Sequence, residues 1–96
     1  MNRSESKVMY KYRLAVTDTQ TLALPDGASI MAVQAQGVDL CLWVEVPTTQ
    51  SGVNVERTFL IRGTGRVFVR TTAERYLGTV QLNEFVWHVY QCLSSL

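Results

Sequence analysis

Five arginines and a single acidic residue lie between Arg57 and Arg75, in a chain whose net charge is only +1. The arginines stand at positions 57, 62, 66, 70 and 75, and the acid is Glu74. A guanidinium presents a planar fork of N–H donors that matches phosphate or carboxylate oxygens. This stretch is therefore the main candidate for binding an anion, a nucleic acid or an acidic protein surface. The alternative is a solvated strand face whose arginines pair with acids elsewhere in the chain.

The segment Gly63–Gly65 (Gly-Thr-Gly) interrupts the arginine stretch. Arg62, Arg66 and Arg70 share sequence parity, so they would face one side of an extended chain unless the glycines introduce a bulge. Glycines also let backbone N–H groups approach an anion closely, as in anion-binding nests. The segment is not a P-loop, because no Lys-Ser or Lys-Thr follows it. The predicted ligand-binding residues are Arg62, Gly63, Thr64, Gly65, Arg66, Arg70 and Arg75.

Other residues with chemical potential are few. His88 is the single histidine, and the sequence shows no nucleophile or orienting acid that would make it a general base. One histidine and two separated cysteines, Cys41 and Cys92, lack the spacing of metal ligands, and buried free thiols are expected for both. The sequence therefore predicts no enzyme, no catalytic residue, no metal and no cofactor.

Two aromatic residues, Trp43 and Phe68, stand apart from the apolar pattern expected of a core. Trp43 has the opposite parity from the apolar face of its segment, and Phe68 lies between Arg66 and Arg70. Aromatic side chains exposed beside arginines suit stacking on bases or a protein interface. A second packed sheet or a subunit contact explains them equally well. We predict that Trp43 and Phe68 are interface residues, and that the chain forms a homo-oligomer.

Strands are the elements expected to position these residues. The 13 valines, 10 threonines and two isoleucines are β-branched, which disfavours helices and suits a pleated surface. The clearest alternation of apolar and polar residues covers 7–16 and 38–46. Further strands are predicted at 21–24, 29–36, 55–62, 66–70, 76–82 and 84–90. Turns or loops are predicted at 17–20, 25–27, 36–38, 47–54 and 83–84, and a Thr-x-x-Glu capping pattern adds one short helical turn near 71–77.

Together these elements predict an all-β fold. About seven or eight short strands with frequent turns are typical of a compact β-sandwich or small barrel. The length of 96 residues fits one domain, expected at 7–93 after a polar, disordered extension at 1–6. No apolar run has the length of a membrane-spanning helix and no signal peptide is evident, so a cytoplasmic location is expected.

Several segments carry a resemblance to a known family. They are Tyr-Lys-Tyr at 10–12, Thr-Asp-Thr-Gln-Thr at 17–21, Leu-Pro-Asp-Gly-Ala at 24–28, Cys-Leu-Trp at 41–43, Ile-Arg-Gly-Thr-Gly at 61–65, Tyr-Leu-Gly-Thr-Val-Gln at 76–81 and Phe-Val-Trp-His-Val at 85–89. The chain thereby resembles a family of small uncharacterised proteins from bacteria and their phages. The resemblance implies no activity and no catalytic residues. The chain departs from it at 1–6 and at 66–70, where relatives have His-Pro and then more polar residues.

The leading hypothesis is a non-enzymatic binding module of the phage or prophage accessory type, with an anti-defence role. It would bind a nucleotide-like anion or a host protein through the arginine-rich surface, in the host cytoplasm if phage-encoded. Small phage proteins of this size often act by binding. The alternatives are a nucleic-acid-binding protein and a small virion component. Nucleic acid is less expected, because the sequence pI is about 7.8 whereas such domains usually exceed about 9.

Overall fold

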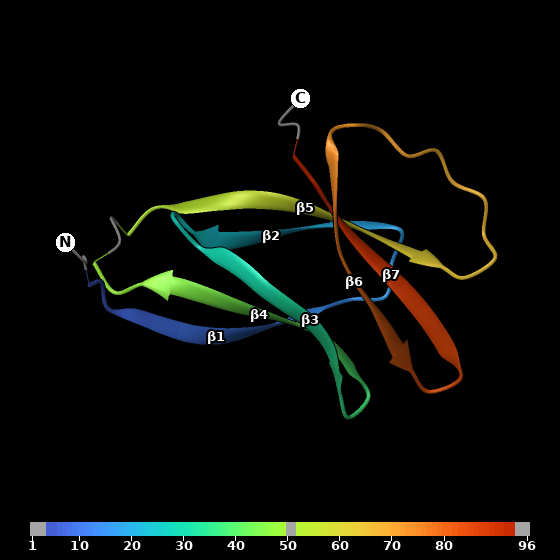
Figure 1. The fold of residues 1–96 in the computed structure, drawn as a ribbon, viewed down its shortest axis with the longest axis horizontal. Coiled ribbons are helices and arrows are strands. Elements are labelled where there is room, and N and C mark those ends of the chain that lie inside the picture. Colours follow the sequence, from blue (N-terminus) through green and yellow to red (C-terminus); the bar gives the residue numbers. More distant parts are fainter. Residues whose placement is uncertain (1–3, 50–51, 94–96) are drawn as a thin grey trace.

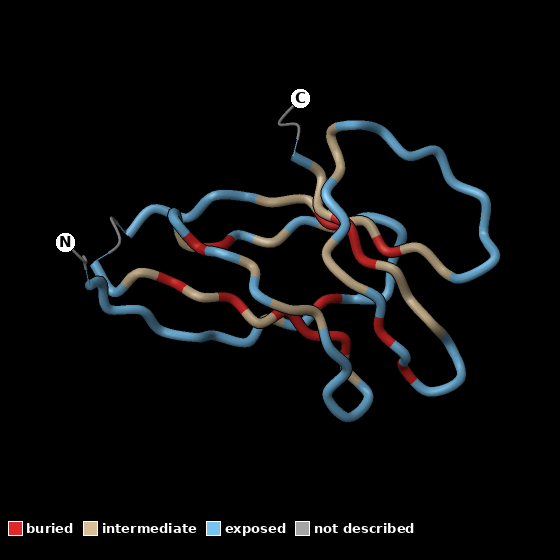
Figure 2. Tube along the Cα trace, viewed as in Figure 1, coloured by how far each residue is buried: buried red, intermediate tan, exposed pale blue. Residues whose placement is uncertain are grey.

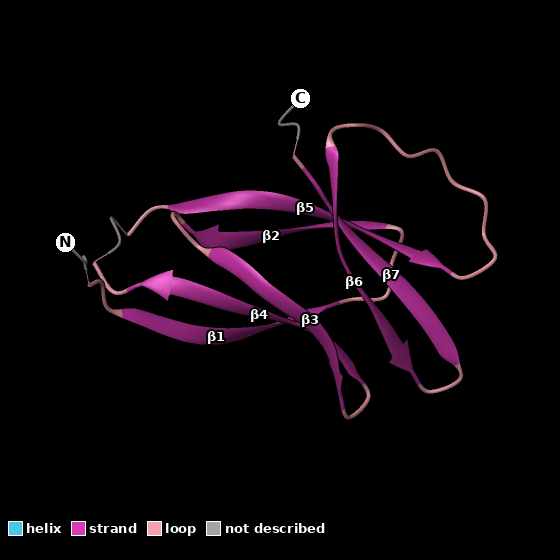
Figure 3. Ribbon diagram, viewed as in Figure 1, coloured by secondary structure: helices cyan, strands magenta, loops and turns pink. Residues whose placement is uncertain are grey.

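The computed structural model describes residues 4–49 and 52–93, and within them every regular element is a strand (Figures 1 and 3). The strands are β1 (Lys7–Leu14), β2 (Thr19–Pro25), β3 (Ser29–Gln36), β4 (Asp39–Pro47), β5 (Asn54–Gly63), β6 (Glu74–Leu82) and β7 (Phe85–Cys92). The predicted all-β fold is therefore confirmed. No segment of the described chain forms a helix that could cross a membrane.

The strands form two antiparallel sheets that pack as a small β-sandwich. One sheet has the order β1-β4-β3 and the other has the order β2-β5-β7-β6. Side chains from both sheets meet in one core, at whose centre Leu42, Val44, Phe59 and Val89 are fully buried. Burial is concentrated along these inner faces, whereas the loops are exposed (Figure 2).

Strand register decides which residues of the four-stranded sheet face the core. Residues directly opposite one another on paired strands point to the same face. Ile61 of β5 lies opposite Val89 of β7, and both are buried in the core. The next row therefore belongs to the outer face, where Arg62 lies opposite His88 and His88 lies opposite Thr79.

The predicted hairpin at 36–38 is confirmed, whereas the first strand ends earlier than predicted. Gln36 pairs with Asp39, and Gly37 takes a positive φ of 62° in the turn between them. β1 ends at Leu14 rather than at residue 16, because the Gln20 side chain bonds the backbone just beyond it. Its Oε1 accepts from the N–H of Ala15 at 2.9 Å, and its Nε2 donates to the Ala15 carbonyl.

Two predictions around the arginine stretch are wrong. Residues 66–70 form no strand but part of the loop that joins β5 to β6. Residues 71–77 contain no helical turn, since Glu74 already begins β6. The Thr-x-x-Glu pattern closes a tight turn instead of a helix cap: the hydroxyl of Thr71 accepts from the N–H of Ala73 at 3.3 Å and donates to the Glu74 carboxylate.

Each sheet has one β-bulge on an edge strand. The register of β3 shifts between Ile30 and Ala32, and that of β6 shifts between Tyr76 and Gly78. These edge strands approach each other where Gly78 faces Val33: a Cβ on that glycine would lie 3.6 Å from the Val33 Cβ. Edge bulges locally disrupt pairing and re-aim side chains, so both sheets are irregular on the same side of the sandwich.

The ends of the chain lie partly outside the described residues. Of the predicted extension at 1–6, residues 1–3 are outside, and residues 4–6 are exposed and form no strand. The carbonyl of Ser6 accepts a hydrogen bond from the N–H of Thr48 at 3.1 Å. Residues 50–51 of the predicted loop at 47–54 and the last residues, 94–96, also lie outside.

Candidate functional site

The structure places the five arginines of the stretch in three different environments. Arg62 lies on the outer face of the four-stranded sheet, and Arg66 and Arg70 lie in the loop that follows β5. Arg57 and Arg75 lie on the inner face, in register with core positions. The arginine-rich stretch is therefore not one continuous surface, because the break at the end of β5 separates its parts.

Arg62 is enclosed within the protein. Its Nη1 lies 2.6 Å from the Oε1 of Glu74, and the two side chains are only 14% and 7% exposed. Its guanidinium carbon lies 4.1 Å from the centre of the Phe68 ring and 4.6 Å from that of Tyr90. The hydrogen bond from Arg62 lowers the pKa of Glu74, with a smaller contribution from Thr71. We infer that Arg62 supports the fold and has few donors left for a ligand.

The loop at 64–73 joins β5 to β6 in a wide arc (Figure 1), and its Phe68 and Val69 contact Arg62. Phe68 packs against Tyr90, with ring centres 5.8 Å apart, and the Val69 carbonyl accepts a weak hydrogen bond from Arg62 at 3.5 Å. Val67 and Val69, on either side of Phe68, are 99% and 82% exposed. The segment thus alternates, with one ring held against the sheet and two valines in solvent. The guanidinium carbon of Arg70 lies 5.2 Å from the Tyr90 ring.

Gly63, Thr64 and Gly65 form the turn at which the chain leaves β5. The N–H of Arg66 donates to the Gly63 carbonyl at 3.2 Å, and Gly65 has a φ of 85°, which favours glycine. Gly63 faces Trp87, whose ring lies 3.2 Å from the position of a Cβ there. The N–H of Thr64 donates to Val86 at 3.2 Å. Since two N–H groups of the turn have internal acceptors, its glycines serve the turn and the packing of Trp87.

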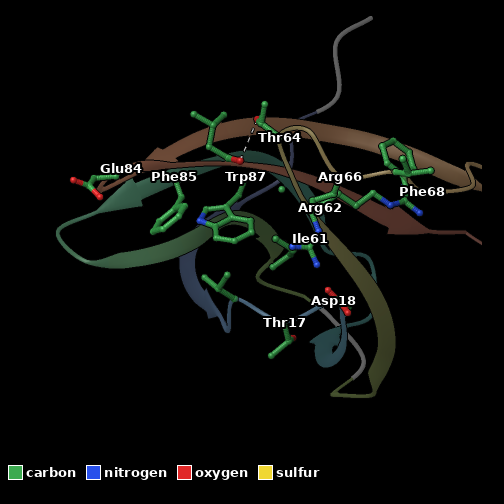
Figure 4. Close-up of a pocket in the computed structure, with 14 residues that line it drawn as sticks. Thr17, Asp18, Ile61, Arg62, Thr64, Arg66, Phe68, Glu84, Phe85 and Trp87 are labelled. Carbon is green, nitrogen blue, oxygen red and sulfur yellow. Dashed lines mark hydrogen bonds between the residues drawn. The ribbon is translucent and has the colours of Figure 1, made fainter.

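A pocket of about 770 Å³ opens at the base of this loop, between the end of β5, the β6–β7 turn and the connection from β1 to β2 (Figure 4). Phe85 and Trp87 lie side by side in it, with ring centres 5.9 Å apart. Apolar side chains from three segments contribute to its lining, namely Val16, Ile61, Phe68, Phe85 and Trp87. Charged side chains of both signs also line it, among them Asp18, Arg66 and Glu84. This mixed lining favours an apolar guest over a strongly charged one.

Sequence reasoning missed most of this pocket. Phe85 and Trp87 fit the alternation of a core strand, and they do face inward, but they lie at the open end of the sandwich. Asp18 was expected only in a turn. A signal that could have located the pocket is the pair of large aromatic residues immediately after the Asn83–Glu84 turn, since a strand end leaves its first inward residues uncovered.

His88 sits on the outer face between two hydroxyl groups. Its Nε2 lies 2.8 Å from the Thr64 hydroxyl and its Nδ1 lies 2.9 Å from that of Thr79, which also contacts the Tyr76 hydroxyl. The Thr64 hydroxyl can donate to the Val86 carbonyl at 3.3 Å while it accepts from Nε2. A neutral ring therefore satisfies both contacts. No carboxylate of the described residues contacts this ring, which a catalytic triad would require.

The remaining predicted residues lie away from this site. Trp43 is half-buried on the outer face of the three-stranded sheet, and its indole N–H donates to the Gln34 side chain at 2.8 Å. Cys41 is buried, as expected, whereas Cys92 is only half-buried. No metal-binding group of three His, Cys, Asp or Glu residues occurs in the described chain.

Fold and surface together define a small antiparallel β-sandwich with one long, exposed and partly apolar loop over the outer face of its larger sheet. Residues 5–94 match the family model described as "Domain of unknown function (DUF7352)", and the chain belongs to this family. This agrees with the resemblance to a family of small uncharacterised proteins. Neither a curated protein nor a solved structure matches the chain.

Proposed function

We propose that this chain is a non-enzymatic binding module that recognises another protein through the β5–β6 loop and the pocket at its base. The observation that carries the proposal is the near-complete exposure of Val67 and Val69 between Arg66 and Arg70. Exposed apolar side chains grouped around a pocket are typical of protein interaction sites. Phe68, held by Arg62 and Tyr90, anchors the loop so that the valines remain presented.

The loop offers an unpaired backbone as well as apolar side chains. Within the described residues, the N–H and C=O groups of Val67 and Phe68 have no hydrogen-bond partner in the protein. An extended segment of this kind can pair with a strand of another chain, so that main-chain bonds give affinity and alternate side chains give specificity. Partner recognition by strand addition therefore fits the loop.

Charge selects the kind of partner. No ion pair engages Arg66 or Arg70 in the described residues, so an extended segment with acidic residues flanking apolar ones would complement them. A second copy of the loop is a poor partner: antiparallel pairing centred on Phe68 would place Arg66 opposite Arg70, and like charges directly opposite are destabilising. We therefore assign an acidic, extended segment of a different protein as the partner.

The pocket beside the loop would accept a side chain of that partner. Its volume of about 770 Å³ lies within the range of roughly 300–1,000 Å³ for sites that enclose small ligands, and Phe85 and Trp87 supply an apolar floor. An aromatic or aliphatic residue next to the paired segment would be desolvated there. Such a buried anchor is where binding energy usually concentrates.

In this proposal the chain is an accessory protein of the phage or prophage type, and its partner is a host protein. The resemblance to small bacterial and phage proteins supports both parts of this assignment. An anti-defence role would follow if that host protein belongs to a defence system. Homo-oligomer formation through Trp43 or other surfaces stays a prediction, and native mass spectrometry tests it.

Site-specific photo-crosslinking in the bacterial host tests the proposal. A photoreactive phenylalanine analogue replaces Val67 in one variant and Val38, an exposed residue of the β3–β4 turn, in the control variant. We expect one protein to crosslink at 67 and not at 38, through a segment rich in Asp or Glu. Arg66→Glu combined with Arg70→Glu should abolish that crosslink while the melting temperature stays unchanged.

Three results would overturn the proposal. Equal crosslinking at positions 67 and 38 would show that the loop has no specific partner. Crosslinks only to other copies of this chain would make the loop a self-association site. Retention of duplex or single-stranded DNA at low salt, lost in the Arg66→Glu, Arg70→Glu variant, would make the loop a nucleic-acid contact instead.

A further inference from the structure

A second pocket, of about 420 Å³, lies between the two sheets on the side where both edge strands are irregular. Arg57 of β5, Arg75 of β6 and Gln91 of β7 line it from the four-stranded sheet, and Ser29 lines it from β3. It shares no lining residue with the pocket at the base of the β5–β6 loop. Its polar groups are guanidinium, amide and hydroxyl, and no carboxylate lines it.

The two arginines of this pocket lack acidic partners. Arg57 donates from Nη2 to the Ala28 carbonyl at 2.7 Å, which fixes one edge of its guanidinium and leaves other donors unused. Among the described residues, no carboxylate lies within ion-pair distance of Arg57 or Arg75. Two cations that face one space repel each other. An anion between them would relieve this repulsion.

Both β-bulges of the described chain open onto this pocket. The extra residue of the β3 bulge is Met31 and that of the β6 bulge is Leu77, and both line the pocket, together with Ile30. Bulges are over-represented next to functional sites, where they re-aim side chains and open an edge. Here they leave room between edge strands that otherwise approach closely at Gly78 and Val33.

We propose that this inter-sheet pocket binds a phosphate monoester. The phosphoryl group lies between Arg57 and Arg75, with the Gln91 amide and Ser29 hydroxyl as further donors, and the organic part lies against Met31 and Leu77. Paired guanidinium groups suit phosphate because their planar forks match its oxygens. This site is independent of the protein-binding loop, so it goes beyond the function proposed above and neither depends on the other.

Phosphate titration followed by amide NMR tests the site. The probes are inorganic phosphate and butyl phosphate, each at constant ionic strength maintained with sodium chloride. We expect both to shift the amide signals of Ser29, Leu77 and Gln91, and butyl phosphate to bind more tightly through its apolar chain. Among the described residues, the Arg75 side chain makes no ion pair or hydrogen bond. Arg75→Gln should therefore fold normally and bind butyl phosphate about tenfold or more weakly.

Arg66→Gln is the matched control, since it removes the same charge from the exposed loop. It should bind both probes like the unmodified protein. Three results would overturn the proposal: unchanged affinity in Arg75→Gln, equal weakening in Arg66→Gln, or shifts that sodium chloride alone reproduces. If butyl phosphate binds no more tightly than inorganic phosphate, the assignment of a monoester is wrong.

Discussion

The outer face of the four-stranded sheet and the inter-sheet pocket use the same residue type in opposite ways. On the outer face, Arg62 is paired with Glu74 and packed between two aromatic rings. In the inter-sheet pocket, Arg57 and Arg75 line the same cavity, and no carboxylate lines it. Arginine content along the chain therefore does not by itself locate an anion site. What distinguishes the proposed site is a pair of arginines that line one pocket without a carboxylate.

Removal of Arg62 should have the largest effect on stability of the changes considered. Arg62→Ala removes the partner of a carboxylate and a cation packed on Phe68 and Tyr90, and we expect a loss of about 2 kcal/mol from the cation–π contacts alone. Arg75→Ala, in the inter-sheet pocket, should stay within about 0.5 kcal/mol of the unmodified protein. Urea denaturation of both variants measures the contrast, and similar losses would show that the two environments do not differ.

The outer-face pair should also make stability depend on pH. Arg62 lowers the pKa of Glu74 below its ordinary value of 4.5, so the ionised pair stabilises the fold above that value. The contribution is lost as the pH falls through the lower pKa of the folded state. We expect the unmodified protein to have a higher melting temperature than Glu74→Gln at pH 7, and the difference to shrink as the pH falls below 4.5. A constant difference across this range would mean that the charge of Glu74 contributes nothing.

Replacing glycine by alanine should destabilise the protein more in the loop than beside the pocket, because only the loop glycine has a backbone conformation that strains other residues. Gly65, in the loop turn, has a φ of 85°, so Gly65→Ala should cost about 1–2 kcal/mol. Gly78, beside the pocket, would place a new Cβ at an ordinary 3.6 Å from Val33. Gly78→Ala should therefore change stability by less than about 0.5 kcal/mol. Thermal unfolding of both variants checks the order, and a larger loss at 78 would contradict it.

A loss smaller than those of Arg62→Ala and Gly65→Ala is expected at the anchor of the loop. Phe68→Ala removes the ring contacts with Tyr90 and Arg62, for which about 1 kcal/mol is expected. Trypsin cleavage after Arg66 or Arg70 should become faster, because the loop detaches from the sheet without global unfolding. Cleavage at an unchanged rate would mean that the ring does not hold the loop. Val67→Ala, which alters an exposed side chain, is the control.

Much of the fold was predictable, because period-two alternation depends only on one face being buried. Lys7–Leu14 and Asp39–Pro47 were found by this pattern. Residues 66–70 alternate equally well, yet no neighbouring strand pairs with them, and pairing is a tertiary property. The site was only partly predictable for the same reason. Sequence grouped five arginines by proximity along the chain, whereas the turn at Gly63 and the strand register divide them between two faces and a loop.

The two sheets are interleaved along the chain, and this constrains how the protein folds. Only β3–β4 and β6–β7 are hairpins of strands that follow each other in sequence. β1 pairs with β4, and β2 pairs with β5, so these partners are made later in the chain. The three-stranded sheet is complete only after residue 47 has been made, and the four-stranded sheet only after residue 92, so ribosomal synthesis exposes the first two strands unpaired for some time. Such non-local pairing gives slow folding, on the order of milliseconds to seconds. We therefore expect the two hairpins to form first, β1 then to pair with β4 and β5 with β7, and β2 to add to β5 last.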